Sequence, residues 1–148
     1  MKKMIRPFVG VGEYMLLSSH NSIIEILNKH KITYHIEKWD NNNCTPAVQW
    51  VIIHANNNIN FFFANDKLFK IYIDGKTDYS LENGIFVGIS MKEAEKLDPK
   101  LQYDDWNEDW SSEDGYWIED NIEDDSVMSI SIFIKEVLDE DLFEKYEW

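Results

Sequence analysis

The sequence predicts an α+β fold, mostly antiparallel sheet with two or three short helices, in a single domain over residues 1–148. Three observations predict this fold. Apolar and polar residues alternate with a period of two over much of the chain, as they do in strands with one buried face. Short turns rich in Asn and Asp separate these runs, and such turns join neighbouring antiparallel strands. Segments with the helical period of 3.6 are few and short.

The first half of the chain predicts a strand, a helix and then a four-stranded meander. The helix begins at Ser18 or Ser19 and carries Ile23, Ile24 and Leu27 at helical spacing. The expected strands cover residues 12–17, 32–39, 47–54, 59–64 and 67–73. Asp74-Gly75 ends the meander with the strongest short hairpin signal in the chain.

The second half predicts a similar order of elements. A strand is expected over residues 84–90, and Ser90 with Glu93 forms a capping box that begins a helix. Pro99 stops that helix because its ring cannot continue it. Further strands are expected over 115–119 and 127–134, and a short final helix begins near Asp139. In the last strand, Met128, Ile130, Ile132 and Ile134 are expected to face inward, and Ser129 and Ser131 outward.

The two halves echo one another in sequence. Residues 12–18 (GEYMLLS) and residues 84–90 (GIFVGIS) both run from a glycine to a serine that begins an amphipathic segment. The echo has two explanations, which are internal duplication, with β-α-β-β-β pseudo-repeats over 9–80 and 81–148, or chance similarity. Both stay open at this stage.

Composition excludes several classes of protein. The chain has 14 basic and 28 acidic residues, a formal charge of −14, which disfavours a nucleic-acid partner because phosphate binding needs clustered Lys and Arg. No apolar run approaches the length that spans a bilayer, so no membrane partner is expected. The lone Cys44 cannot form an internal disulfide or a Cys-based zinc site. We expect a cytoplasmic protein.

The sequence shows no motif for catalysis or for a cofactor. The four histidines have no metal-binding spacing, and no phosphate-binding loop is present. The loop from Asp109 to Asp120 resembles a calcium loop, but its glycine is seventh rather than sixth. A pair of carboxylates for glycoside hydrolysis would need one acid held neutral in an apolar pocket. We expect no enzyme activity and no cofactor, and a raised carboxyl pKa in a cleft would argue otherwise.

The acidic residues are concentrated in the second half. Residues 81–148 contain 5 basic and 21 acidic residues, and residues 98–125 contain twelve carboxylates against Lys100 alone. Like charges this close repel one another and destabilise the fold. A solvated acidic surface that keeps the protein soluble is the simplest explanation.

Large aromatic residues lie between these carboxylates. An acidic segment that served only to keep the protein soluble would lack such aromatic residues. In residues 115–119, Tyr116 and Ile118 share one face, which leaves Trp117 and Glu119 on the other. Aromatic anchors and complementary charge are typical of protein interfaces. The alternative is that Trp106 and Trp110 fill a core. The predicted partner-binding residues are Asp104, Asp105, Trp106, Glu108, Asp109, Trp110, Glu113, Asp114, Trp117, Glu119 and Asp120.

The second half resembles small bacterial immunity proteins of polymorphic and contact-dependent growth inhibition toxin systems. The resemblance lies in residues 83–93, 98–105, 115–119 and 127–134, and more weakly in the first 35 residues. It implies a cytosolic protein that binds and neutralises a cognate toxin C-terminal domain without a cofactor. A nuclease toxin would be basic, which suits an acidic surface. The alternative is a nucleic-acid mimic that inhibits a DNA-binding protein.

Overall fold

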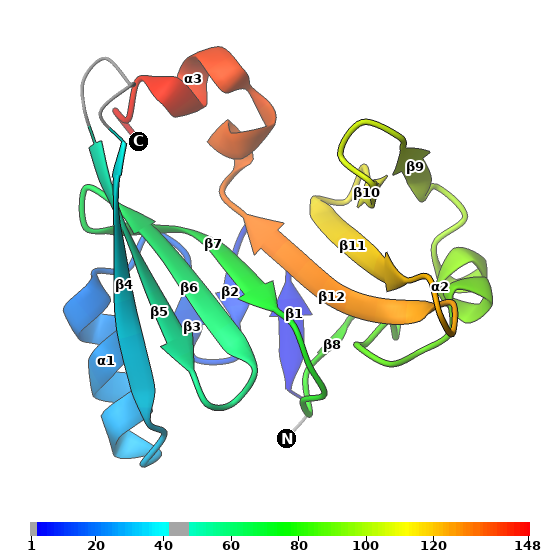
Figure 1. Ribbon diagram of the computed structural model, residues 1–148, viewed down its shortest axis with the longest axis horizontal. Coiled ribbons are helices and arrows are strands. Elements are labelled where there is room, and N and C mark those ends of the chain that lie inside the picture. Colours follow the sequence, from blue (N-terminus) through cyan, green and yellow to red (C-terminus); the bar gives the residue numbers. More distant parts are fainter. Residues whose placement is uncertain (1–2, 42–47) are drawn as a thin grey trace.

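The computed structural model describes residues 3–41 and 48–148, and its main feature is one large sheet (Figure 1). All strand pairs in this sheet are antiparallel. Its order is β4 (Tyr34–Asn41), β5 (Val48–Ala55), β6 (Ile59–Ala64), β7 (Lys67–Ile73), β12 (Ser126–Phe133), β11 (Tyr116–Asn121), β10 (Asp109–Ser112) and β9 (Gln102–Asp104).

A small sheet and the helices complete the fold. The small sheet has the order β3 (Tyr14–Met15), β2 (Gly10–Val11), β1 (Met4–Arg6) and β8 (Ser80–Leu81), and its β1–β8 pair is parallel. The helical segments are α1 (His20–Lys29), α2 (Met91–Leu97), the 3₁₀ turn η1 (Lys135–Leu138) and α3 (Glu140–Glu144). The predicted α+β class is therefore confirmed.

The main part of the core lies on one face of the large sheet. Ile53, Phe61, Ile71 and Ile132 form a continuous row across β5, β6, β7 and β12, and each is at most 1% exposed. The small sheet and α1 cover this row with apolar side chains of the same cluster, including Ile5, Val11, Ile23 and Leu27. The opposite face of the large sheet carries polar and aromatic side chains, and the cleft described below opens on it.

The large sheet consists of two four-stranded meanders, β4–β7 and β9–β12, that meet at the β7–β12 pair. The register at this seam places Ile73 opposite Ile130, Tyr72 opposite Ser131, Ile71 opposite Ile132 and Lys70 opposite Phe133. Each meander also has one bulge at its last hairpin, between Phe62 and Phe63 or between Glu119 and Asp120.

The segments before the helices repeat the same pattern. Leu17 and Ser18 hydrogen-bond the backbone of Leu68 in β7, and Gly88 and Ile89 hydrogen-bond that of Val127 in β12. Serines then cap both helices, Ser19 for α1 and Ser90 for α2. The two halves thus share one plan, and gene duplication as its origin stays a prediction.

Several predicted elements differ from the structure. Residues 84–90 form turns rather than a strand, because Gly84 and Gly88 have φ of +99° and +107°. Within residues 12–17 only Tyr14–Met15 is strand. Asp74-Gly75 ends the meander as expected, but an irregular connection to β8 follows it instead of a hairpin.

Two further differences concern single side chains and a loop. Met128 is 44% exposed rather than inward, because the bulge beside Asp120 shifts the alternation of β12. The β-α-β-β-β plan for residues 81–148 implied one strand between the helix and residue 115, without bounds, whereas the structure has two there, β9 and β10. Cys44 and the expected start of the strand at residue 47 lie outside the described residues.

Candidate functional site

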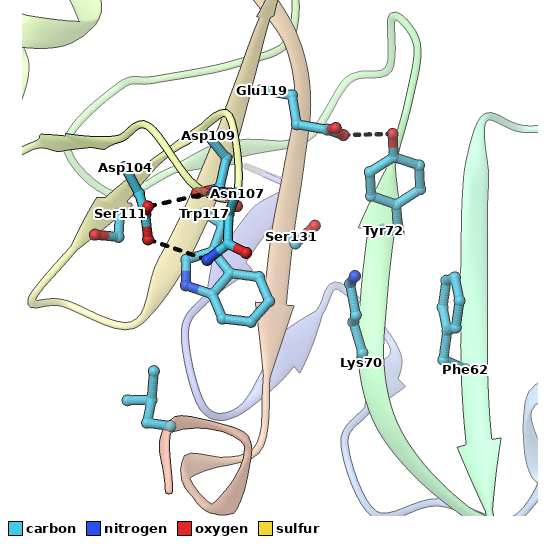
Figure 2. Close-up of a pocket in the computed structure, with 11 residues that line it drawn as sticks. Phe62, Lys70, Tyr72, Asp104, Asn107, Asp109, Ser111, Trp117, Glu119 and Ser131 are labelled. Carbon is cyan, nitrogen blue, oxygen red and sulfur yellow. Dashed lines mark hydrogen bonds between the residues drawn. The ribbon is translucent and has the colours of Figure 1, made fainter. Parts of the chain in front are cut away.

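A cleft of about 580 Å³ opens on the face of the large sheet opposite the core (Figure 2). Its floor is made by side chains of β6, β7, β11 and β12, and the turn between β9 and β10 forms one wall. The residues that line it are Phe62, Lys70, Tyr72, Asp104, Asn107, Asp109, Ser111, Trp117, Glu119, Ser131 and Leu138. We call this surface the sheet-face cleft.

The sheet-face cleft spans the seam between the two halves of the molecule. The first half contributes Phe62, Lys70 and Tyr72, and the second contributes the carboxylates and Trp117. Across the seam, the Tyr72 hydroxyl donates a hydrogen bond of 2.6 Å to Glu119 Oε1. Ser129 Oγ donates a second bond of 2.6 Å to the same oxygen. Burial, followed by the bond to Glu119, raises the pKa of Tyr72 to about 12, so its hydroxyl remains a donor.

Lys70 lies at the centre of the floor and is held by aromatic rings. Its Nζ is 5.1 Å from the Phe62 ring centroid and 5.6 Å from those of Tyr72 and Trp117, within the range of cation–π attraction. None of the described residues accepts a hydrogen bond from it. Burial lowers the pKa of Lys70, against the attraction of Glu119 and Asp109.

Two aspartates face each other on the wall of the cleft. Asp104 of β9 is the direct cross-strand partner of Asp109 of β10, and like charges in that position repel. Asp104 accepts hydrogen bonds from the backbone of Trp106 and from Asn107, which shape the turn. Asp109 is half-buried, and none of the described residues donates a hydrogen bond to its carboxylate. Burial, with the charges of Asp104 and Glu119, raises the pKa of Asp109.

A second cleft of about 690 Å³ adjoins the first, and the walls of both include Asn107 and Glu119. Its other lining residues are Tyr103, Glu108, Trp110, Asp120, Ile122 and Met128. Ile122 is 92% exposed, so this cleft has an apolar rim beside its carboxylates. We call it the rim cleft.

Trp110 belongs to the core side of the sheet. It pairs with Ile118 across β10 and β11 and packs edge-on against Tyr103 with ring centroids 5.3 Å apart. Its indole Nε1 is buried and has no hydrogen-bond partner among the described residues. The alternative of a core position therefore holds for Trp110, apart from the edge that lines the rim cleft.

Trp106, unlike Trp110, lies on the surface. It lies on the turn between β9 and β10 and is 92% exposed, and its neighbour Asp105 is exposed too. Trp117 lies on the face opposite Tyr116 and Ile118, as predicted, but Phe133 covers part of its ring at a centroid distance of 4.3 Å. It is half-buried rather than free.

The structure brings most of the predicted site residues together, but not all. Asp104, Asp109, Trp117 and Glu119 line the sheet-face cleft, and Glu108, Trp110, Glu119 and Asp120 line the rim cleft. Glu113 and Asp114 lie at the turn between β10 and β11 and line neither cleft. Asp114 pairs with Lys100 at 2.8 Å, which raises the pKa of that lysine.

One carboxylate of the acidic stretch is structural. Asp98 is 2% exposed and accepts hydrogen bonds from Ser112, Tyr116 and the Lys100 backbone. Burial works to raise its pKa, but the hydrogen bonds together lower it. This acid stabilises the connection between α2 and β11 and is not available to a partner.

Sequence reasoning missed the half of the sheet-face cleft that comes from β6 and β7. Phe62, Lys70 and Tyr72 lie in a part of the chain with little net charge, well before the acidic stretch that begins at residue 98. The alternation of Lys70 and Tyr72 with Phe69, Ile71 and Ile73 marks them as outward-facing. Only the β7–β12 pairing, however, places them beside Trp117.

Neither a metal ion nor a membrane is indicated by the part of the chain that is described. No group of three His, Cys, Asp or Glu side chains there could hold a metal ion. The described helices are all too short or too polar to cross a bilayer.

The chain matches no protein-family model, no curated protein and no solved structure.

Proposed function

We propose that the protein is an immunity protein that binds and neutralises a basic, nuclease-type toxin domain with the two adjoining clefts and the Trp106 turn between β9 and β10. The resemblance noted above and the surface chemistry support this proposal. Inhibition by binding requires no catalysis, and about 800 Å² on each partner is sufficient for a stable complex. No cofactor takes part.

The observation that carries the proposal is the exposure of Trp106. An indole that is 92% exposed contributes nothing to the core of this chain. Burying it in a partner would remove on the order of 150–250 Å² of largely apolar surface from water. Tryptophans of this kind dominate the affinity of many interfaces.

The rim cleft, whose lining includes Asn107 and Glu108 directly after Trp106 in the chain, has the composition of an interface. It contains exposed apolar side chains, with Ile122 at 92%, Tyr103 at 46% and Met128 at 44% exposure. The carboxylates of Glu108, Glu119 and Asp120 line the same cleft. An apolar centre gives affinity, and a charged rim gives orientation and fast association. The acidic field would attract a partner that binds nucleic acid through Lys and Arg.

Co-production with the protein encoded immediately upstream tests the proposal. We expect growth arrest caused by that protein to be relieved by the wild-type chain. Trp106→Ala should weaken relief, and its complex should dissociate about 30-fold faster, which corresponds to about 2 kcal/mol for an anchor residue. Undiminished arrest in the presence of the wild-type chain would contradict the proposal.

Charge reversal tests which surface is used. Replacing Asp104, Asp105, Glu108 and Asp109 by Lys should slow association and reduce its dependence on salt. The matched control replaces Glu25, Glu95, Glu123 and Glu144, which are exposed acids outside both clefts. Both variants change the net charge equally, so only the first should lose the fast association.

A second candidate function is acid–base hydrolysis, because the raised pKa of Asp109 in a cleft is a feature of a general acid. Glycoside hydrolysis, however, passes through a positively charged transition state. The ammonium group of Lys70 in the same cleft would disfavour that charge. Chromogenic glycosides test this candidate, and hydrolysis that disappears in Asp109→Asn would support it over binding alone.

A further inference from the structure

Asp109 and Lys70 stand out in the sheet-face cleft because neither charged group has a hydrogen-bond partner among the described residues. The fold places Asp109 directly opposite Asp104, and such a pair costs about 0.2–1 kcal/mol in a sheet. The lining contains the carboxylates of Asp104, Asp109 and Glu119 against the single ammonium of Lys70. The cleft therefore has an excess of negative charge, and among the described residues no side chain or backbone group donates a hydrogen bond to its half-buried Asp109 carboxylate.

The geometry points to an occupant with several donors in one plane: the sheet-face cleft receives an arginine side chain of the basic partner, with its guanidinium between Asp109 and Asp104 and beside the Trp117 indole. This inference rests on the proposed function and deepens it by naming the anchor on the partner.

The arrangement of the side chains favours arginine over lysine. Figure 2 shows Asp104, Asn107 and Asp109 on one side of the Trp117 indole and Lys70, Tyr72 and Phe62 on the other. A planar guanidinium carries five donors and can bond two carboxylates while it lies against an aromatic ring. An ammonium group is a point charge and offers no flat face.

The neighbouring hydrogen bonds keep the site open and its walls in place. Asn107 and the Trp106 backbone hold Asp104, and Tyr72 and Ser129 hold Glu119. Lys70 is kept back by the rings of Phe62, Tyr72 and Trp117. Asp109 is the carboxylate that remains without a donor, so it is the one whose loss should matter most.

Titration with N-acetyl-L-argininamide, observed through the indole N–H resonance of Trp117, tests this inference without the partner. The neutral isostere N-acetyl-L-citrullinamide should bind at least about tenfold more weakly, because a hydrogen bond to a charged group is worth about 1.5–3 kcal/mol. N-acetyl-L-lysinamide should also bind more weakly than the arginine compound. Equal binding of either control compound would overturn the inference.

Three variants locate the binding. Asp109→Asn should weaken argininamide binding about tenfold. The matched control Asp105→Asn, which removes one exposed charge nearby, should change binding less than twofold. Lys70→Met should bind argininamide as well or more tightly, because it removes a repelling charge. Equal effects of the two aspartate variants, or loss of binding in Lys70→Met, would overturn the inference.

The two proposals can fail separately. If Asp109→Asn loses argininamide but still relieves growth arrest fully, the partner's anchor is not in this cleft and the immunity function stands. If the wild-type chain binds argininamide but relieves no arrest, the cleft is an arginine site and the immunity function is wrong.

Discussion

His54 of β5 is the centre of a hydrogen-bonded chain on the same open face of the sheet. Its Nε2 lies 2.9 Å from Glu37 Oε1, and its Nδ1 lies 2.7 Å from Asn60 Oδ1. Asn60 Nδ2 donates to the Tyr72 carbonyl, which fixes the orientation of the amide. Both partners of the imidazole therefore accept, so both ring nitrogens must donate. Only the protonated form of His54 satisfies this geometry.

The pKa of His54 is raised above its ordinary value of 6.5. Burial acts against the charged form, but the hydrogen bonds to Glu37 and Asn60 outweigh it. The stabilisation is complete below pH 6.5 and is lost as the pH rises through the higher folded-state pKa. We expect the urea midpoint to fall between pH 6 and pH 8.

His54→Gln and Glu37→Gln should both reduce the dependence of the urea midpoint on pH, since either substitution removes the charged pair between His54 and Glu37. His30→Gln, which changes a histidine bound to Glu13 on another part of the surface, should leave the His54 component in place. A wild-type midpoint that rises over the same pH interval would contradict the assignment. Because Glu37 is nearly half exposed, solvent screening should keep the change in stability small.

At the scale of elements, the caps of the two main helices are equivalent. Ser19 Oγ accepts a hydrogen bond from the backbone N–H of Ser22, and Ser90 Oγ accepts one from that of Glu93. Each serine follows a residue pair that joins its helix to the last strand of its meander. The cap therefore fixes where the helix leaves the sheet as well as where it begins.

Ser19→Ala and Ser90→Ala should each lower the free energy of unfolding by about 1 kcal/mol, because each leaves a helix-start amide without its acceptor. Chemical denaturation measures both. Ser18→Ala is the matched control, since only the backbone of Ser18 takes part in a hydrogen bond. A cost in Ser18→Ala equal to that in Ser19→Ala would show that the cap is not the cause.

The helices and the strands of the first meander could be predicted because their signals are local. The capping serines and the alternation of residues 67–73 need only neighbours in sequence. Residues 84–90 also alternate, but glycines at positive φ turn the chain there. The bounds of β9 and β10, and the presence of two strands rather than one, could not be predicted, because acidic residues have low strand propensity and the β9–β10–β11 pairing overrides it.

Only part of the candidate site could be predicted, again because sequence signals are local and strand pairing is not. Charge density identified Asp104, Asp109 and Glu119, and alternation identified the outward face of Trp117. Alternation marks Lys70 and Tyr72 as outward-facing, but their place in the cleft comes from the β7–β12 pairing, which no local signal shows. Composition could not show that Trp110 packs against the core while Trp106 is exposed, since both tryptophans lie among acidic residues.

At the scale of the whole molecule, acidic charge is gathered on one half. The chain carries 28 acidic and 14 basic residues, and residues 81–148 hold most of the acids. Apart from the pair between Lys100 and Asp114, the acids of β9 to β11 have few basic neighbours. Their mutual repulsion opposes the folded state. A nucleic-acid mimic would need such charges, but not the exposed apolar residues between them.

Added salt should therefore stabilise the protein. We expect the thermal midpoint to rise by several degrees between 0.01 and 0.5 M NaCl, since the Debye length falls from about 30 Å to below 8 Å. Neutralising Asp124 and Asp125, which line neither cleft, should raise the midpoint at low salt and reduce the gain from added salt. A midpoint that falls with salt would show that attractive pairs dominate instead.

The β7–β12 pairing between the two meanders also determines when the sheet-face cleft can form during synthesis of the chain. Phe62, Lys70 and Tyr72 leave the ribosome well before Ser131 and Leu138 of the same cleft. The first meander can form its own hairpins beforehand, but it cannot bring its lysine and tyrosine beside the indole until β12 pairs with β7. If the sheet-face cleft binds the partner proposed above, only chains in which β12 has been made can bind it, and shorter nascent copies do not compete for it.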